Sequence, residues 1–256
     1  MRIALGIEYD GSPFQGWQWQ QNAPSVQAEV ESALSKIANH PVTVVCSGRT
    51  DAGVHARCQI VHFDTESVRT PRAWILGSNS LLPDTIAIHF AQQVADGFHA
   101  RFDARARRYR YTIANRPARP AIGRPQLSWV REPIDHERMQ DAAQVLVGTH
   151  DFSALRTVAC QAKNPVRSIH HIRFQRDGDL VHMDIQANAF LHHMVRNIVG
   201  SLLPIGHGER DAAWLRSVLE SRDRKLAGVT AEANGLVFLG PMYPRECGLP
   251  ESLSLP

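Results

Sequence analysis

Apolar and polar residues alternate along several short stretches of the chain, which is the pattern of strands in a half-buried sheet. From Arg2 to Tyr9 the apolar side chains fall on every second residue, which matches the two-residue period of a β-strand. Asp177-Gly178 joins two such stretches and predicts a tight hairpin. The strands predicted in this way are 2–9, 42–47, 56–65, 86–93, 107–115, 166–176, 180–187 and 236–242.

Between these stretches the apolar residues change to helical spacing. Val26, Val30 and Ile37 lie on one stripe of a predicted helix, and Ser25 is placed to cap its start. Four further helices are predicted. One begins at Pro71, one follows the cap Asp135, and the last two cover 193–203 and 211–219.

The order of these elements predicts an α+β protein built from two similar halves. The first half reads β-α-β-β-α-β and the second has a similar order, which is typical of ferredoxin-like units with antiparallel sheets. We place the halves at 1–103 and 104–256. Because no Gly/Ser-rich linker separates them, we expect them to pack rigidly around a central cleft, which is the natural place for a ligand.

The composition indicates a globular protein of the reducing cytoplasm. The chain has 256 residues, 43% of them hydrophobic, which is enough for a true core. We expect no membrane span, because no apolar run is long enough, and no secretion, because the chain starts without an apolar signal core. The four cysteines form no C-x-x-C pair, which argues against zinc and redox motifs.

The basic residues are unusual in kind and in placement. The net charge is only +3, but just three of the 28 basic residues are lysine. Eight arginines and one acid lie between Arg101 and Arg124, and arginine suits both phosphates and stacked bases. An RNA-binding groove and a merely solvated basic strand in an arginine-rich chain explain this equally well. The residues of this stretch that we predict to bind RNA are Arg105, Arg107, Arg108 and Arg110.

The most informative stretch for chemistry is Ser47–Ala56, which lies between two predicted strands. It places Asp51 in a turn between two glycines, with Arg49 two residues earlier. Glycines let the backbone take conformations that side chains forbid, and an ionised carboxylate beside a guanidinium can act as nucleophile or base. Ordinary turn chemistry is the alternative, in which Asp51 bonds a nearby N–H and Gly53 takes a positive φ.

Five segments resemble, in the same order, the signature segments of the TruA family of tRNA pseudouridine synthases. They are Tyr9–Gln18, Ser47–Ala56, Phe98–Phe102, Arg107–Tyr111 and Asn188–Asn197. The resemblance covers nearly the whole chain, from residue 3 to about 244. It implies the pseudouridine synthase fold, in which two ferredoxin-like (RRM-like) halves surround the cleft.

The resemblance also implies roles for single residues. Asp51 would be the catalytic residue, and Tyr109 would line the uracil pocket, where its ring can stack on a flipped base. Arg196 lies on an apolar-rich helix, where a charge needs a partner, and the family pattern implies that this partner is Asp51. Arg49 would enter the RNA and hold the base out of its stack, and Leu236 would pack on the uracil.

Each of these residues also has a purely structural interpretation. Tyr109 would then be a core residue of its strand, and Leu236 a core residue of the last strand. Arg196 would lie at a helix surface with only water as its partner, and Arg49 would be a turn arginine on a phosphate. Without the family resemblance, the structural interpretation of Tyr109 would be preferred.

The function that the resemblance implies is isomerisation of uridine to pseudouridine at positions 38, 39 and 40 of tRNA. The base must be flipped out of its stem for this reaction. Asp51 then has three possible routes: attack on the sugar, addition to the ring, or removal of a sugar proton. The family implies a homodimer whose two subunits both contact the tRNA.

We expect no cofactor and no metal. The reaction needs neither a redox change nor a group transfer, and the pairs His170-His171 and His192-His193 lack metal-site spacing. A silent RNA-binding protein on the same scaffold is one alternative, although it would not need an ionised carboxylate facing phosphates. A hydrolase is another, but the chain offers no second acid of the kind that glycosidases use.

Overall fold

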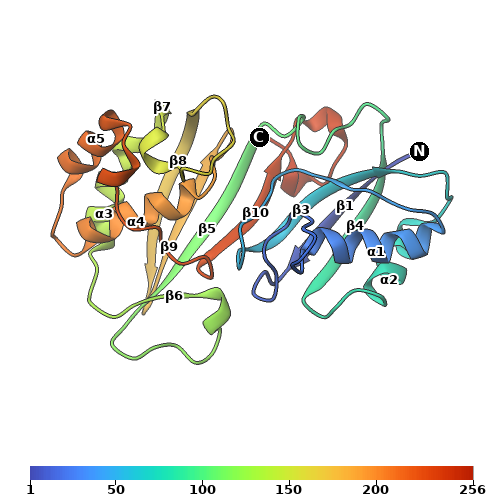
Figure 1. The fold of residues 1–256 in the computed structure, drawn as a ribbon, viewed down its shortest axis with the longest axis horizontal. Coiled ribbons are helices and arrows are strands. Elements are labelled where there is room, and N and C mark those ends of the chain that lie inside the picture. Colours follow the sequence, from blue (N-terminus) through green and yellow to red (C-terminus); the bar gives the residue numbers. More distant parts are fainter. Residues whose placement is uncertain (256) are drawn as a thin grey trace. The chain divides into compact units, whose positions relative to one another are not determined.

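The structure is a computed structural model that describes residues 1–255. Helices combine with mostly antiparallel strands (Figure 1), which confirms the predicted α+β class. The chain forms two compact units. The first contains Met1–Ala106 together with the segment that begins at Phe238, and the second contains Arg107–Val237. Among residues 1–255, no helix has both the length and the apolar content that a membrane span requires.

The first unit has the ferredoxin-like order of elements. These are β1 (Arg2–Tyr9), α1 (Val26–Ala38), β2 (Val45–Cys46), β3 (His55–Asp64), α2 (Pro71–Asn79) and β4 (Ile86–Val94). The strands lie in the order β4-β1-β3, and β2 pairs with β3. All of these pairings are antiparallel, with β1 in the centre between β3 and β4.

Side-chain caps fix the starts of several helices. The Ser25 hydroxyl accepts a hydrogen bond from the N–H of Ala28 at 3.3 Å, and that of Thr70 accepts one from Ala73 at 3.2 Å. The Asp135 carboxylate accepts two such bonds at the start of the helix α3 (His136–Ala143). These oxygens satisfy N–H groups that have no partner inside the helix.

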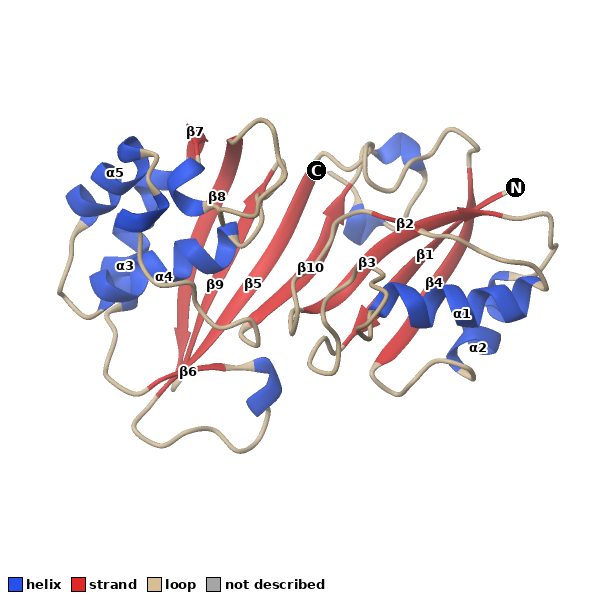
Figure 2. Ribbon diagram, in the orientation of Figure 1, coloured by secondary structure: helices blue, strands red, loops and turns tan. Residues whose placement is uncertain are grey.

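The helices α1 and α2 pack on one face of the first sheet (Figure 2). The ring of Trp74 in α2 meets the edge of Phe63 in β3, with 5.2 Å between the ring centroids. Gly77 lets the two helices approach closely, because a Cβ at this position would lie 2.8 Å from the Cδ1 atom of Ile37.

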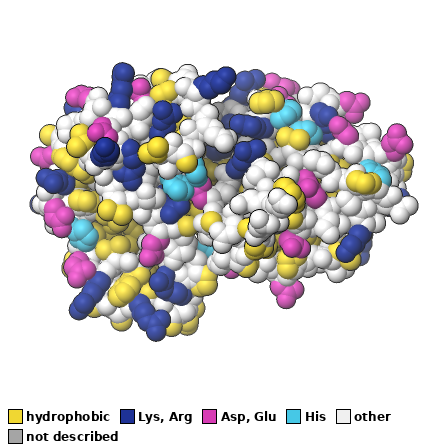
Figure 3. All heavy atoms as spheres, in the orientation of Figure 1, with side chains coloured by type: hydrophobic (Ala, Val, Ile, Leu, Met, Phe, Trp, Pro, Cys, Tyr) yellow, Lys and Arg dark blue, Asp and Glu magenta, His cyan; other side chains and the backbone are white. Residues whose placement is uncertain are grey.

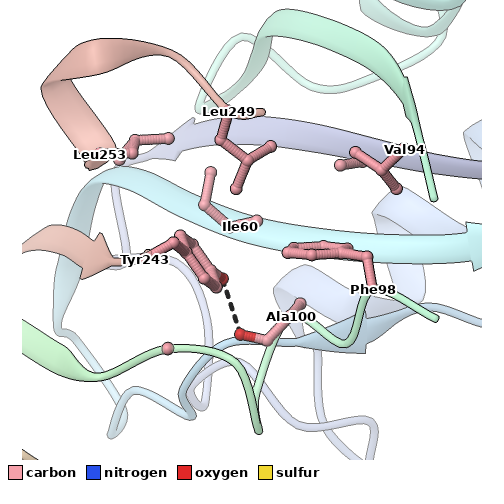
Figure 4. Close-up of a cluster of buried hydrophobic side chains, with 9 residues drawn as sticks. Ile60, Val94, Phe98, Ala100, Tyr243, Leu249 and Leu253 are labelled. Carbon is pink, nitrogen blue, oxygen red and sulfur yellow. Dashed lines mark hydrogen bonds between the residues drawn. The ribbon is translucent and has the colours of Figure 1, made fainter. Parts of the chain in front are cut away.

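The opposite face of this sheet is covered by the end of the chain. Ile60 and Val94 project from the sheet toward Phe98, Tyr243 and Leu253 in one buried cluster (Figure 4). The Tyr243 hydroxyl donates to the carbonyl of Ala100 at 2.6 Å, which ties the two covering segments together.

The strand predicted over 42–47 is shorter than expected. Only Val45–Cys46 forms β2. The N–H of Val42 donates instead to the Ser35 hydroxyl at 2.8 Å, and the N–H of Val44 donates to the Glu31 carboxylate at 2.9 Å. Because side chains of α1 take these donors, the segment is held against the helix and does not extend the ladder.

The second unit has an antiparallel sheet in the order β5-β9-β8-β7, with the short strand β6 parallel to β5. Its strands are β5 (Ala106–Asn115), β6 (Ser128–Val130), β7 (Gly148–Asp151), β8 (Val166–Asp177) and β9 (Leu180–Ala187). Its helices are α3 (His136–Ala143), α4 (Met194–Gly206) and α5 (Ala212–Ser221). The predicted hairpin turns at Gly178, which has φ 54°. The short strands β6 and β7 were not predicted.

A half-buried amide joins the helix α3 to the sheet of the second unit. The Gln140 side chain on α3 accepts from the N–H of Phe174 at 2.7 Å and donates to the carbonyl of Ile172 at 3.4 Å. Both partners belong to β8. The amide therefore satisfies strand groups while fixing the position of α3 on the sheet.

The last strand, β10 (Leu236–Met242), crosses the boundary between the two units. Just before it, the carbonyl of Gly235 accepts from the N–H of Thr112 in the second unit. At its end, the carbonyl of Met242 accepts from the N–H of Arg105 in the first. The expected division into 1–103 and 104–256 differs here, because the residues after Phe238 belong to the first unit's core.

Candidate active site

Asp51 lies in the turn between β2 and β3 and is half-buried. Its carbonyl accepts from the N–H of Val54 at 3.1 Å, which closes the turn. Gly53 has φ 74°, a conformation that disfavours residues with a Cβ. The backbone that carries the Asp51 side chain is thus set by local geometry.

The loop after β1 holds this turn from one side. The N–H of Trp17 donates to the carbonyl of Thr50 at 3.1 Å, and the N–H of Gly53 donates to the carbonyl of Phe14 at 3.3 Å. Gly16 permits the close approach, since a Cβ there would lie 2.7 Å from the Thr50 carbonyl oxygen. Two of the five signature segments therefore meet at Asp51 within the first unit.

The hydroxyl of Tyr9 adds a buried contact to the same turn. It lies 2.7 Å from the hydroxyl of Thr50, the residue before Asp51. Tyr9 is 2% exposed and Thr50 is 7% exposed, so this hydrogen bond is shielded from water. The sequence interpretation counted Tyr9 as a strand residue and as the first residue of a signature segment, but it missed this contact with the turn.

A second buried contact ties the loop to the start of β3. The Nδ1 atom of His55 lies 3.0 Å from the Asp10 carboxylate and accepts from the N–H of Gly11 at 3.1 Å. Burial acts to raise the pKa of Asp10, but hydrogen bonds from Ser12 and the nearby His55 outweigh it and lower the pKa below its ordinary value. Asp10 is accordingly held ionised in the loop.

The other end of the turn is fixed by a buried amide. The Ser47 hydroxyl donates to the Gln59 side chain at 2.7 Å, and the Gln59 amide donates to the carbonyl of Gly48. Arg49 follows directly and is exposed. Burial raises the pKa of the Cys46 thiol to about 11, although the charges of Arg49 and Arg101 act in the opposite direction. Both guanidinium groups are therefore close to this end of the turn.

Tyr109 lies on β5 in the second unit, opposite Ile185 on β9. Its ring meets that of Phe190 edge to face, with 5.1 Å between centroids and 86° between planes. Tyr109 is 9% exposed. The ring is therefore held by a side chain of another signature segment, Asn188–Asn197.

Arg196 on α4 is joined to the segment that leads into β10. Its Nε atom donates to the carbonyl of Ala231 at 2.8 Å, and its own carbonyl accepts from the N–H of Ala231 at 3.2 Å. The interpretation in which Arg196 has only water as its partner is therefore wrong. Leu236 follows five residues after Ala231 and is 4% exposed.

The four arginines predicted to bind RNA differ in their contacts. Arg110 forms a two-pronged ion pair with Asp184, with both N–O distances 2.7 Å, so its guanidinium is already neutralised. Arg107 donates to the carbonyl of Asn188 at 3.0 Å. Arg105 is exposed and Arg108 is half-buried. On the face drawn in Figure 3, Lys and Arg side chains are interspersed with Asp and Glu.

Comparison with known proteins identifies the family. The family model described as "tRNA pseudouridine synthase" matches residues 6–103 and 142–244, more than half of the chain. The chain therefore belongs to the tRNA pseudouridine synthase family.

Individual relatives match over their full length. "tRNA pseudouridine synthase A" of Xanthomonas axonopodis pv. citri (strain 306) is 56% identical over 256 residues, covering 99% of this chain and 100% of the relative. The protein of the same name from Stenotrophomonas maltophilia (strain R551-3) is 54% identical and covers 100% of both chains. Asp51, Arg196 and Leu236 lie in segments that the family model matches, whereas Tyr109 lies between them.

Proposed function

We propose that this chain converts uridine to pseudouridine in tRNA, with Asp51 as the catalytic carboxylate. The observation that carries the proposal is that hydrogen bonds fix the turn in which Asp51 lies. The chain that contains this turn belongs to the tRNA pseudouridine synthase family. Hydrogen bonds from the loop after β1 and from Gln59 on β3 restrict this turn. A catalytic group held in this way loses little freedom on reaching the transition state.

The reaction exchanges one bond to the sugar for another. The N1–C1′ bond of the uridine breaks, the uracil turns while bound, and a C5–C1′ bond forms. The proton on C5 is lost and N1 gains one, so the product is an isomer of the substrate. The target base must leave its stem first, which costs a few kcal/mol. This chemistry needs no oxidant, reductant or group donor.

The remaining site residues are proposed to surround the flipped base. Tyr109 would stack on the uracil, Leu236 would pack against it, and Arg196 would pair with Asp51. Arg49 would occupy the place that the base leaves in the RNA stack. The support for Tyr109 is that Phe190 holds its ring at a fixed angle, and that for Arg196 is its fixed contact with Ala231.

The substrate sites, the assembly and the compartment are part of the same proposal. We propose uridines 38, 39 and 40 of tRNA as targets, a homodimer as the active form, and the cytoplasm as the compartment. Arg105, Arg107 and Arg108 would contact phosphates, whereas Arg110 would do so less, because Asp184 already pairs with it. RNA affinity should then fall steeply with added salt, and a flat salt response would contradict these phosphate contacts.

The direct test is the change Asp51→Asn, assayed by mapping pseudouridine in a tRNA transcript. We expect loss of isomerisation while tRNA affinity is kept, because the change removes a charge without changing the size of the side chain. Asp84→Asn makes the same chemical change on an exposed residue of the first unit, and it should retain full activity. Product formation by Asp51→Asn at the wild-type rate would refute the catalytic role.

The same assay separates an isomerase from a hydrolase. A hydrolase would release free uracil, whereas an isomerase leaves every base attached to the RNA. Chromatography of the reaction mixture for uracil, together with pseudouridine mapping, therefore distinguishes the two. A sedimentation measurement of the wild-type protein tests the homodimer independently of the chemistry.

A further inference from the structure

An exposed aromatic ring stands in the first unit, in the signature segment Phe98–Phe102. Phe102 is 71% exposed, whereas Phe98 in the same segment is 4% exposed. A single exposed apolar side chain needs no explanation by itself. Phe102 differs from such a residue because the structure holds its ring in one orientation.

The support for this ring comes from His99. The two rings stack with 4.1 Å between centroids and 25° between planes. The Nδ1 atom of His99 also accepts from the N–H groups of Arg101 and Phe102, each at 3.2 Å. Asp103 completes the turn, since its carboxylate accepts from the N–H of His99 at 2.8 Å.

His99 is in turn joined to the buried core. Its ring lies edge-on to that of His62, with 4.9 Å between centroids, and His62 lies edge-on to Phe98 at 6.0 Å. His62 is 4% exposed and accepts from the N–H of Ala100 at 3.1 Å. The exposed ring of Phe102 is therefore the outer member of a series of rings that begins in the core.

Positive charge lies over the exposed ring. The guanidinium carbon of Arg101 is 5.9 Å from the centroid of Phe102. Arg101 and Arg49 both act electrostatically on the Cys46 thiol, so the two guanidinium groups are near the turn that carries Asp51. An aromatic platform beside basic groups is the combination with which proteins bind unpaired nucleotides.

We propose that Phe102 is a stacking platform for an unpaired base of the RNA substrate, separate from the uracil that reacts, with Arg101 placed for an adjoining phosphate. The inference rests on the proposed RNA-modifying function and assigns an additional RNA-binding site to it. His99 stacks on one face of the Phe102 ring, and the Arg101 guanidinium lies over the ring at 5.9 Å. A base that stacks on Phe102 therefore takes the place of this guanidinium, which is then free to reach a phosphate. Because the platform is ordered beforehand, little conformational entropy is lost on binding.

The test measures the affinity for an anticodon stem-loop RNA by fluorescence anisotropy. Phe102→Ala should raise Kd by roughly five- to hundredfold, the range expected for one base stacked on an aromatic ring. Phe102→Trp should keep or increase the affinity, whereas Phe102→Leu should lose it, because leucine provides apolar area but no ring face. Val68→Ala removes a similarly exposed apolar residue of the same unit, 76% exposed, and should leave Kd unchanged.

Abasic substitutions at successive unpaired positions of the RNA identify the stacked base. At one position, removal of the base should raise the Kd of the wild-type protein but should not raise the Kd of Phe102→Ala any further. Wild-type affinity in Phe102→Ala or in Phe102→Leu would overturn the proposal. A loss accompanied by a change of oligomeric state in sedimentation would also overturn it, because Phe102 would then contact a second copy of the chain.

The outcome is distinguishable from failure of the proposed function. Absence of pseudouridine in the wild-type reaction would refute the activity, whereas the Kd series addresses the stacking site alone. In single-turnover assays, Phe102→Ala should raise the enzyme concentration that gives the half-maximal rate by the same factor as it raises Kd, whereas Val68→Ala should leave that concentration unchanged. Asp51→Asn should instead keep its binding and lose the reaction.

Discussion

The hydroxyl oxygen of Tyr9 lies 2.7 Å from that of Thr50, the residue that precedes Asp51. Both side chains are buried, and they come from segments about forty positions apart in the chain. This hydrogen bond joins the end of β1 to the turn that carries the proposed catalytic carboxylate. It makes the position of Asp51 depend on a residue that does not touch the substrate in our proposal.

Tyr9→Phe should therefore lower the rate more than it lowers the affinity. The change leaves the Thr50 hydroxyl buried without this partner, which should cost about 1–3 kcal/mol of folding stability. A small displacement of Asp51 should reduce kcat by about tenfold or more, with KM for tRNA little changed. Single-turnover kinetics and urea unfolding measure the two effects.

A matched control removes a comparable hydroxyl elsewhere in the first unit. Tyr243 is fully buried and donates to the carbonyl of Ala100 at 2.6 Å. Tyr243→Phe should cost similar stability but leave kcat at saturating tRNA unchanged. An equal loss of kcat in both variants would mean that Tyr9 acts only through general stability.

Gly16→Ala should disrupt the same turn from its other side. Gly16 has φ 99°, and an added Cβ would lie 2.7 Å from the Thr50 carbonyl oxygen. Strain and displacement together should cost on the order of 1–3 kcal/mol and most of the activity. Gly97→Ala places a methyl group where no heavy atom lies within 4 Å, and it should change stability by less than about 0.5 kcal/mol. Thermal unfolding of the two variants checks the difference.

Arg196→Lys should lower activity although the charge is kept. The Nε atom of Arg196 donates to the carbonyl of Ala231 at 2.8 Å, and a lysine cannot make this bond while also pairing with a carboxylate as a fork. We expect a fall in kcat of about tenfold or more. Arg222→Lys tests the same exchange at a surface ion pair with Asp151, where the arginine side chain is 68% exposed. There, activity should be unaffected.

Folding stability should fall as the pH drops from about 6.5 toward 4, partly through His62. Burial, with help from the charges of Arg2 and His99, lowers the pKa of His62 to about 4. In this window the unfolded chain binds a proton that the folded chain does not, so acidification favours unfolding. The cost for this group is on the order of 2–3 kcal/mol.

His62→Gln isolates this contribution from those of other titrating groups. The glutamine oxygen can still accept from the N–H of Ala100, which now bonds to Nδ1 of His62, but it cannot be protonated in this range. Urea unfolding between pH 7 and 4.5 should show a shallower loss of stability in the variant. Parallel pH profiles for the two proteins would contradict the assignment to His62.

Much of the order of elements in the chain could be predicted, because local patterns determine it. The two-residue period of β1, the caps Ser25 and Asp135 and the hairpin at Gly178 each depend on neighbours in the chain. The end of β10 at Met242 was also predicted correctly. The strand prediction over Val42–Val44 was wrong, because a contact outside the local pattern decides this segment. Side chains of α1 accept hydrogen bonds from the N–H groups of Val42 and Val44, which therefore do not join the sheet.

The sequence by itself determined the α+β class, most helix and strand positions and the family, because these depend on periodicity, caps and short ordered motifs. Only the tertiary structure decided that the chain's end, through Tyr243 and Leu253, covers the first sheet. It alone brought Tyr9 to Thr50 and stacked Phe102 on His99. A pattern along the chain states which side chains are apolar or charged. Which of them meet depends on how the sheet's two faces are covered, and that is settled by packing between distant segments.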